Sequence, residues 1–334
     1  MGDFVDCSIA VRPAEEKQSR AFGLPNATAA PFTAGSFVCS VSAGASVNCP
    51  VLHTCAHSNG THTEGAAHVL PGQRTLSEAW TPAAAPVVTA LLVSVTPRRL
   101  GDSSDQYSPG AADDLAITSE AVEEALSALR SAAAGAGSAA SSWLAESGER
   151  ACLGAVCLRT LPNDGAKVGR DWTGSNPAFL TGEAALLCRA LVAPPTGDDS
   201  DSTGHLLVDL PSVDREDDGG ALIAHRSFFG VTPAGRASAL ASGPVLPASP
   251  EAGAAAGAAG AASPDDACSA AAPAAPAAAP PAYMPRRAIT ELCFFSDALS
   301  DGLHALNLQC ANVELDAAPS RPLLAPLRRV AAAP

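Results

Sequence analysis

The chain has 334 residues, enough for one large or two ordinary domains, and it is 47% hydrophobic but only 4% aromatic. Its formal net charge of −14 argues against a nucleic-acid or anionic-membrane partner, because both favour basic patches. No apolar stretch reaches the roughly 20 residues that cross a bilayer, and Met1–Asp6 lacks the basic and apolar segments of a signal peptide. Ten cysteines in such a chain favour reduced thiols and a cytoplasmic location.

Residues 3–50 read as short strands and turns, and they lead into a segment rich in metal-binding groups. Three of the chain's 7 histidines, together with one glutamate, fall within twelve residues: His57, His62, His68 and Glu64. Imidazole nitrogen and carboxylate oxygen are the donors that zinc, manganese and iron accept. The segment therefore predicts a metal site, whereas the competing interpretation is a polar surface loop with scattered histidines.

The spacing of these residues has a geometric meaning. In extended chain His62 and Glu64 point to the same face, because alternate side chains share a face. His57 has the opposite parity, but Asn59-Gly60 lies between, and this dipeptide readily turns the chain. We expect such a turn to bring His57 to the ion that His62 and Glu64 hold, and His68 to lie close enough to act as a ligand or a proton carrier.

Beyond this segment, strands alternate with helices. Continuous apolar runs predict buried strands at Val87–Val95, Leu153–Leu158 and Leu206–Asp209. Apolar residues at helical spacing predict a helix over Ser119–Ala132, and Thr181 is the expected N-cap of another. The alternation predicts an α/β layer architecture.

The stretch 246–281 consists almost entirely of Ala, Pro, Gly and Ser. Its few large apolar groups cannot offset the entropy of ordering, so we expect a disordered insert. The predicted organisation is one domain over residues 1–334 that is interrupted by this low-complexity insert.

The twelve-residue segment resembles the signature of the cyclase-like metal hydrolases, the family of bacterial kynurenine formamidase, which reads His-x-Gly-Thr-His-x-Asp-x-Pro-x-His. Gly60–His62 and His68 match it in place. There are three departures: the first histidine is one residue further upstream, Glu64 replaces Asp, and Ala66 replaces Pro. The departures suggest a sub-branch of the family.

The resemblance extends from Ile9 to Pro322 on either side of the insert, and it includes the landmark segments Leu210–Asp214 and Asp316–Pro322. It implies a swivelling β/β/α fold. It also implies two further metal ligands, His225 in an Ala-His-Arg segment and Glu291 in an Ile-Thr-Glu-Leu segment.

The resemblance implies a chemistry and a set of roles as well. His57, His62 and Glu64 would hold a zinc ion, with manganese as an alternative, and Glu64 could bridge to a second ion bound by His225 and Glu291. His68 would be the catalytic acid that protonates the leaving amine. The implied activity is arylformamidase, which converts N-formylkynurenine to kynurenine and formate in tryptophan catabolism, the kynurenine pathway. The expected partners are a small-molecule substrate and further copies of the chain, since family members are commonly oligomeric.

Three other interpretations stay open. The same site could hydrolyse another cyclic amide or lactam, such as isatin. His62, Glu64 and His225 also satisfy the two-histidine, one-carboxylate triad of non-haem iron oxygenases, although three clustered histidines and the strand–helix alternation suit that class poorly. A non-catalytic, metal-binding relative is the third, and the complete set of candidate ligands argues against it.

Overall fold

The structure, a computed structural model, describes residues 2–73, 75–79, 87–136, 153–192, 203–231 and 286–327. The predicted insert at 246–281 lies outside the described residues, so the expectation for it stays a prediction. Among the described residues, no helix is both long enough and apolar enough to cross a bilayer. The eight cysteines described are free thiols, as the sequence predicts.

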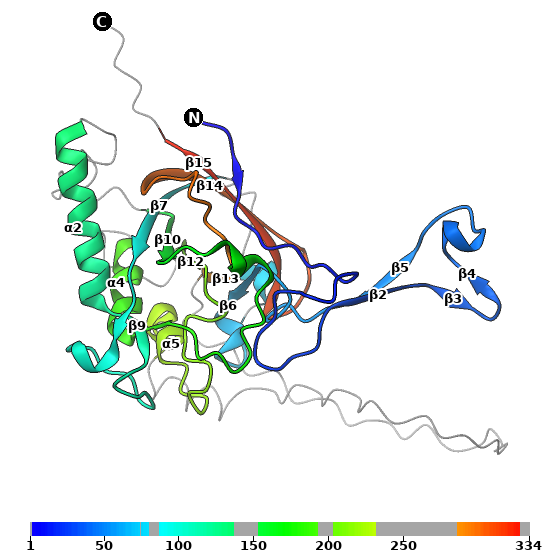
Figure 1. Ribbon diagram of the computed structural model, residues 1–334, viewed down its shortest axis with the longest axis horizontal. Coiled ribbons are helices and arrows are strands. Elements are labelled where there is room, and N and C mark those ends of the chain that lie inside the picture. Colours follow the sequence, from blue (N-terminus) through cyan, green and yellow to red (C-terminus); the bar gives the residue numbers. More distant parts are fainter. Residues whose placement is uncertain are drawn as a thin grey trace, which may run out of the picture.

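Seven strands form a sheet that closes on itself (Figure 1). Their order is β15–β14–β7–β10–β12–β13–β6, and β6 pairs back onto β15. The strands are β6 (His62–Gly65), β7 (Val88–Val95), β10 (Ala155–Thr160), β12 (Thr203–Val208), β13 (Arg286–Glu291), β14 (Gly302–Cys310) and β15 (Ala317–Pro326). A short strand, β1 (Val5–Asp6), pairs with Leu323 and Leu324 of β15, beyond the residues of β15 that pair with β6.

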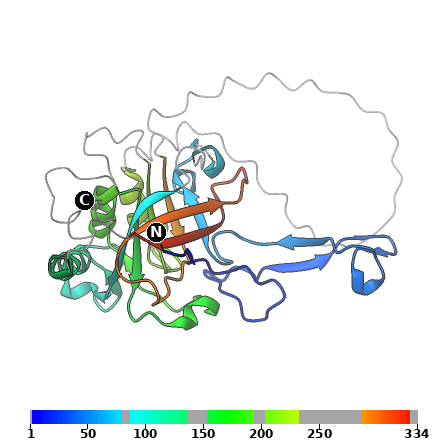
Figure 2. The same cartoon turned by 90° about the horizontal axis from the view of Figure 1, so that it is seen from above.

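The four strands from β7 to β13 are parallel, and the remaining pairs of the barrel are antiparallel. Parallel neighbours need crossover connections. Helices α2 (Ser119–Ala136) and α4 (Gly182–Val192) lie in two of these connections, and α5 (Ile223–Phe229) begins the third. These three helices lie against the outer face of the parallel strands, which gives the predicted α/β layers (Figures 1 and 2).

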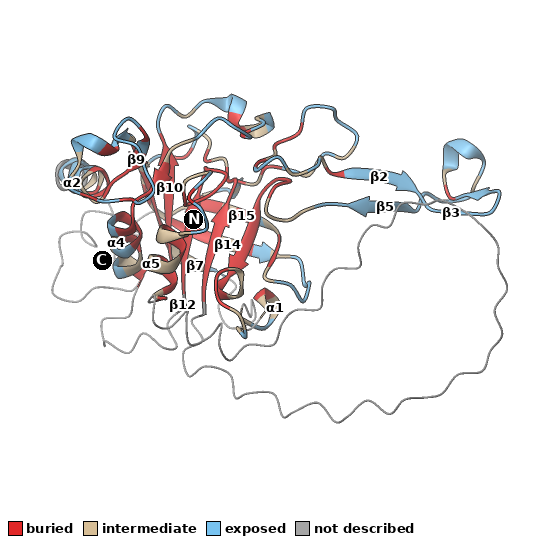
Figure 3. Cartoon of the chain, turned by 90° about the horizontal axis from the view of Figure 1, so that it is seen from below, coloured by how far each residue is buried: buried red, intermediate tan, exposed pale blue. Residues whose placement is uncertain are grey.

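The two faces of the barrel carry separate cores because side chains alternate along each strand. On β7, Ala90 and Leu92 point inward and pack with cysteines, leucines and Phe295. Leu91 and Val93 point outward and pack against the helices. Figure 3 shows the barrel strands almost entirely buried.

The predicted elements are found where the sequence places them, with small differences at their ends. The first helix continues past Ala132 to Ala136, because the alanines that follow its predicted end favour helix. Thr181 caps α4 as expected, with its hydroxyl oxygen accepting a hydrogen bond from the Ala184 amide at 3.1 Å. The segment that follows β7 contains two short elements, β8 (Arg98–Arg99) and η3 (Leu100–Asp102).

Two further small elements are a three-stranded sheet and a short helix. Strands β8, β9 (Leu115–Ile117) and β11 (Phe179–Leu180) form a three-stranded sheet. A short helix, α1 (Leu76–Ala79), lies beside β6 and β13.

One part of the chain extends away from the barrel. Strands β2 (Thr28–Pro31) and β5 (Pro50–His53) pair as a two-stranded ribbon, with β3 (Thr33–Ala34) and β4 (Phe37–Val38) paired at its outer end. We call Thr28–His53 the N-terminal arm. Figures 1 and 2 show it projecting well beyond the barrel, and Figure 3 shows most of it exposed, although Cys39 is buried.

Candidate metal centre

Strand β6 presents two of the predicted ligands on one face. His62 and Glu64 alternate along β6, and neither side chain is exposed to solvent. Thr63 lies between them and points the other way, where its hydroxyl is 2.7 Å from that of Thr290. The shared face of His62 and Glu64, predicted from strand parity, is therefore confirmed.

The turn before β6 is also as predicted. Gly60 has a φ of +87°, and a β-carbon there would lie 2.6 Å from the Ile9 carbonyl oxygen. Only glycine fits this position, because L side chains avoid this φ and the neighbouring backbone is too close. The turn places His57 beside Glu64, with 3.1 Å between His57 Nδ1 and Glu64 Oε2.

The two ligands expected from the distant parts of the chain reach the same place. Helix α5 carries His225, whose Nε2 lies 2.6 Å from Glu64 Oε1. Glu291 ends β13, directly opposite His62 in the ladder, with 3.3 Å between His62 Nε2 and Glu291 Oε2. The Val213 amide donates to the other oxygen of Glu291 at 2.7 Å and so fixes this carboxylate.

His68 follows β6 in a short 3₁₀ helix, η2 (Ala66–His68), and its ring stacks on that of His57 with 4.3 Å between centroids. His68 Nε2 lies 3.8 Å from Glu64 Oε2. All six side chains singled out by sequence thus lie together, and we call them the histidine–carboxylate cluster: His57, His62, Glu64, His68, His225 and Glu291.

Two aspartates that were not predicted as site residues bind the rings of the cluster. Asp214 Oδ2 lies 2.5 Å from His225 Nδ1. Asp316 Oδ2 lies 3.0 Å from both His57 Nε2 and His68 Nδ1. Both aspartates belong to segments that resemble the family, but their roles depend on contacts across long stretches of sequence that spacing does not reveal.

The charges of the cluster shift the pKa values of its members. Burial opposes ionisation of Glu64, but the imidazoles of His68 and His225 outweigh it and hold the pKa of Glu64 well below its usual range. Burial likewise disfavours a charged His225, yet Glu64 and Asp214 raise its pKa well above normal. In the same way, Asp316 and Glu64 overcome burial and raise the pKa of His57 to about 10.

The orientation of three rings fits a metal ion. Each turns Nδ1 to an oxygen that can only accept a hydrogen bond, so Nδ1 carries a proton and Nε2 is the ring atom turned toward the carboxylates of the cluster, where an ion would bind. The acceptors are the Gly60 carbonyl for His62, Asp316 for His68 and Asp214 for His225. Carboxylate or carbonyl acceptors of this kind are the usual supports of metal-binding histidines.

Two buried atoms of the cluster also point to an ion. His62 Nε2 has no hydrogen-bond partner among the described residues, although buried polar atoms normally have one. Glu64 Oε2 accepts no well-aligned hydrogen bond there either, although His57 Nδ1 lies 3.1 Å from it. Two groups, each with three potential ligand atoms within 4.8 Å of one another, share Glu64: His57, Glu64 and His68 in one, and His62, Glu64 and Glu291 in the other. The donor set therefore fits one or two divalent ions.

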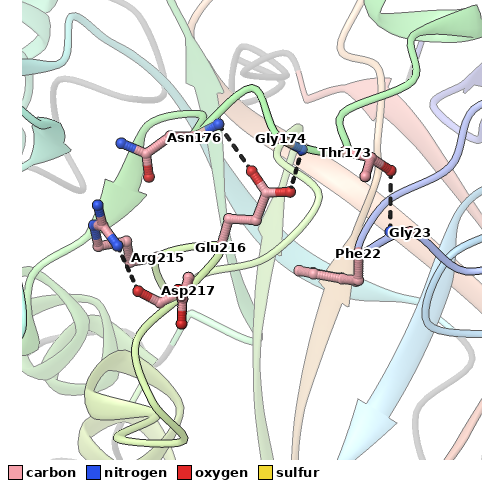
Figure 4. Close-up of a pocket in the computed structure, with 8 residues that line it drawn as sticks. All are labelled: Phe22, Gly23, Thr173, Gly174, Asn176, Arg215, Glu216 and Asp217. Carbon is pink, nitrogen blue, oxygen red and sulfur yellow. Dashed lines mark hydrogen bonds between the residues drawn. The ribbon is translucent and has the colours of Figure 1, made fainter.

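A surface pocket of about 540 Å³ lies outside the cluster, and Figure 4 shows the residues that line it. Its lining residues come from three loops: Phe22, Gly23, Thr173, Gly174, Asn176, Arg215, Glu216 and Asp217. The Glu216 carboxylate accepts hydrogen bonds from the Gly174 and Asn176 amides inside it. Because none of the residues that line it belongs to the histidine–carboxylate cluster, we place the candidate site at the cluster.

No family model and no curated protein matches the sequence. Among solved structures, isatin hydrolase A from Ralstonia solanacearum matches with a TM-score of 0.50 and 11% identity, over 96% of this chain and 91% of that chain. Isatin hydrolase A from Labrenzia aggregata gives a TM-score of 0.47 and 12% identity, over 96% and 93%. A potential metal-dependent hydrolase with cyclase activity gives 0.45 and 12%, over 97% and 98%. The chain therefore has the cyclase-like fold that its sequence predicts.

Proposed function

We propose that this protein is a metal-dependent hydrolase of amide C–N bonds. The observation that carries the proposal is the pair of candidate ligand groups that share Glu64, His57 with His68 in one and His62 with Glu291 in the other, each with its ligand atoms within 4.8 Å of one another. His57, His62, Glu64, His225 and Glu291 would hold the ion. Zinc suits this mixture of nitrogen and oxygen donors, and manganese is the alternative.

A divalent ion in this position supplies Lewis-acid polarisation of a carbonyl group and lowers the pKa of water. The residues of the chain would bind the ion and orient its ligands. Glu64 belongs to both groups of candidate ligands, so it is the residue suited to bridge two ions. Asp214 holds the His225 ring in one orientation through its Nδ1.

His68 is suited to proton transfer because it lies at the open side of the cluster. Its side chain is 27% exposed, whereas Glu64 is fully buried. Asp316 accepts the Nδ1 proton of His68, which leaves Nε2 to exchange a proton with the substrate. In the proposed reaction water supplies the oxygen of the new carboxylate, the C–N bond breaks, and the leaving nitrogen takes a proton from His68.

The first candidate substrate is an N-formyl arylamine, N-formylkynurenine, which would make the protein an arylformamidase. The resemblance of the His57–His68 segment to the kynurenine formamidase signature supports this substrate. The replacement of the signature Asp by Glu64 lengthens one ligand by a methylene group.

The second candidate is a lactam such as isatin. The observation that favours it is the match of the fold to isatin hydrolase A from Ralstonia solanacearum. Hydrolysis of a lactam breaks the same kind of bond, but the leaving nitrogen stays attached to the product. Both candidates therefore require the same ion, the same proton donor and the same buried ligands.

Metal analysis of the purified protein, together with assays on N-formylkynurenine and isatin, tests the proposal. We expect at least one divalent ion per chain, and turnover of one of the two substrates that disappears on chelation and returns with zinc or manganese. Glu64→Gln should lose both ion and turnover. His53→Ala is the matched control, because His53 is exposed on the N-terminal arm and should keep both. A metal-free protein that still hydrolyses either substrate would contradict the proposal.

A further inference from the structure

Tyr107 is a buried side chain that lies outside the histidine–carboxylate cluster and contacts one of its supports. It belongs to the segment between η3 and β9, and its side chain is buried. The ring packs against Phe179 with 4.5 Å between the ring centroids. A buried tyrosine hydroxyl usually has a hydrogen-bond partner, and one partner of this hydroxyl is the carboxylate that binds the His225 ring.

The Tyr107 hydroxyl lies between two aspartates. Its oxygen is 2.8 Å from Asp214 Oδ1 and 3.2 Å from Asp218 Oδ2. It also accepts a hydrogen bond from the Arg215 amide at 3.1 Å. A phenolic hydroxyl has one proton to donate, so it cannot serve both carboxylates fully at the same time. The shorter of the two distances favours Asp214 as the acceptor.

The Asp214 carboxylate has four hydrogen-bond partners in the described part of the chain. Oδ1 accepts from the Tyr107 hydroxyl and from the Ala224 amide, the latter at 2.6 Å. Oδ2 lies 3.2 Å from the His225 amide and 2.5 Å from the His225 ring Nδ1. An ionised carboxylate has about four acceptor sites, so these partners fill them. Three of the four come from α5, and Tyr107 supplies the one that does not.

The separate origin of the Tyr107 contact matters for the direction of the His225 ring. Contacts from α5 alone would let the carboxylate turn together with that helix, whereas a donor on another segment fixes the plane of the carboxylate. This plane decides how Asp214 Oδ2 holds His225 Nδ1, and therefore where Nε2 points. Nε2 lies 2.6 Å from Glu64 Oε1, within the cluster.

We infer that Tyr107 is a positioning residue of the metal centre, because its hydroxyl fixes the Asp214 carboxylate and this carboxylate orients the His225 ring. The inference rests on the proposed function, since it takes His225 as a metal ligand. Tyr107 acts through Asp214 and contacts none of the six side chains of the cluster through its hydroxyl.

The zinc affinity of the full chain tests the inference without any assay of turnover. Competition between the metal-free protein and a chelator of known affinity gives the dissociation constant for zinc. Tyr107→Phe keeps the ring and removes only the hydroxyl. The dissociation constant should rise about three- to tenfold, which is less than the 10–100-fold typical of a direct partner of a ligating histidine. Asp218→Asn is the matched control, because it alters the other carboxylate beside the same hydroxyl; it should bind zinc as the wild type does.

A double variant distinguishes a positioning role from a general effect on packing. If Tyr107 acts through Asp214, the addition of Tyr107→Phe to Asp214→Ala should change the dissociation constant by less than about twofold, because the side chain that the hydroxyl orients is already gone. Independent effects would instead multiply. A double variant that shows the full product of the two single effects would overturn the inference.

Two tyrosine analogues test whether the donated proton is what matters. 4-Aminophenylalanine in place of Tyr107 restores an N–H donor at the position of the hydroxyl, so zinc affinity should return to within about twofold of the wild type. 4-Fluorophenylalanine fills the same space but donates no hydrogen bond, so it should bind zinc as weakly as Tyr107→Phe does. Equal affinities for the two analogues would overturn the inference.

Circular dichroism of each variant establishes that the barrel is folded before its zinc affinity is compared. A wild-type protein that binds no divalent ion would overturn the proposed function and this inference together. If the wild type binds zinc and Tyr107→Phe binds it equally well, this inference alone is wrong.

Discussion

The inner and outer halves of the histidine–carboxylate cluster differ in exposure and in what fixes their rings. The inner rings, His62 and His225, have exposed side-chain fractions of 0% and 2%. The outer rings, His57 and His68, are 24% and 27% exposed, and both bind the half-exposed Asp316. Buried imidazoles suit metal binding, whereas a partly exposed ring that is not needed as a ligand, such as His68, suits proton exchange. The histidines and carboxylates of the cluster therefore differ in their surroundings, and we expect them to have different roles.

The largest expected effect concerns the inner half. His62→Ala should remove both the ion and the activity, because it deletes a buried ligand and leaves Glu291 facing an empty space. Metal content after dialysis and turnover with added zinc or manganese are the measurements. If His62→Ala keeps its ion, the ion is held by His57, Glu64 and His68. The outer half of the cluster, and not the inner half, is then the metal site.

The second prediction concerns the outer half. His68→Ala should keep most of its metal yet lose roughly 10²–10⁴-fold in turnover, the usual range for a general acid or base. One limb of the pH–rate profile should disappear with it. If the His68→Ala protein is free of metal, His68 is a metal ligand. If it is fully active, the leaving amine needs no acid from the protein.

A smaller effect is expected for Asp214→Asn, which keeps the shape of the side chain but removes the charge that orients His225. Metal affinity should fall by about 10–100-fold, as for other residues that support a ligating histidine. Competition with a chelator of known affinity measures this change. Asp218→Asn is a suitable control, because Asp218 shares the Tyr107 hydroxyl with Asp214 but does not contact His225; it should leave the affinity close to that of the wild type.

The smallest effect is expected for Asp316→Asn. Asp316 is 38% exposed, and ion pairs of this exposure contribute about 1 kcal/mol or less, so turnover should fall by less than about tenfold while metal content stays unchanged. Steady-state kinetics and metal analysis on the same sample provide the comparison. Loss of the ion from this variant would show that metal binding depends on the orientation that Asp316 gives to the His57 and His68 rings.

The sequence predicted well that His57, His62 and Glu64 lie together, and it predicted the order of the main strands and helices, because both depend on local pattern. Strand parity placed His62 and Glu64 on one face, and the Asn-Gly turn accounted for His57. Asp214 and Asp316 were not predicted as partners of the rings. Asp316 lies 259 positions from His57, and a contact of that range is decided by the closure of the barrel, which no local pattern encodes.

The arm illustrates the other limit of prediction from sequence. The segment before the cluster was expected to contain short strands and turns, and it does. Its extension away from the barrel could not be predicted, because apolar strands are equally compatible with a buried core. The absence of charge from Arg20 to Glu64 was the available signal that this stretch differs from the rest.

Strand β6 closes the barrel and also carries His62 and Glu64, while Glu291 lies on the neighbouring strand β13. An ion bound by these side chains joins two strands whose paired residues, such as Thr63 and Thr290, are 227 positions apart. The free energy of ion binding then adds to the free energy of unfolding, by about 2.7 kcal/mol when free metal is a hundredfold above its dissociation constant. Metal binding would thus affect the resistance of the protein to unfolding as well as its activity.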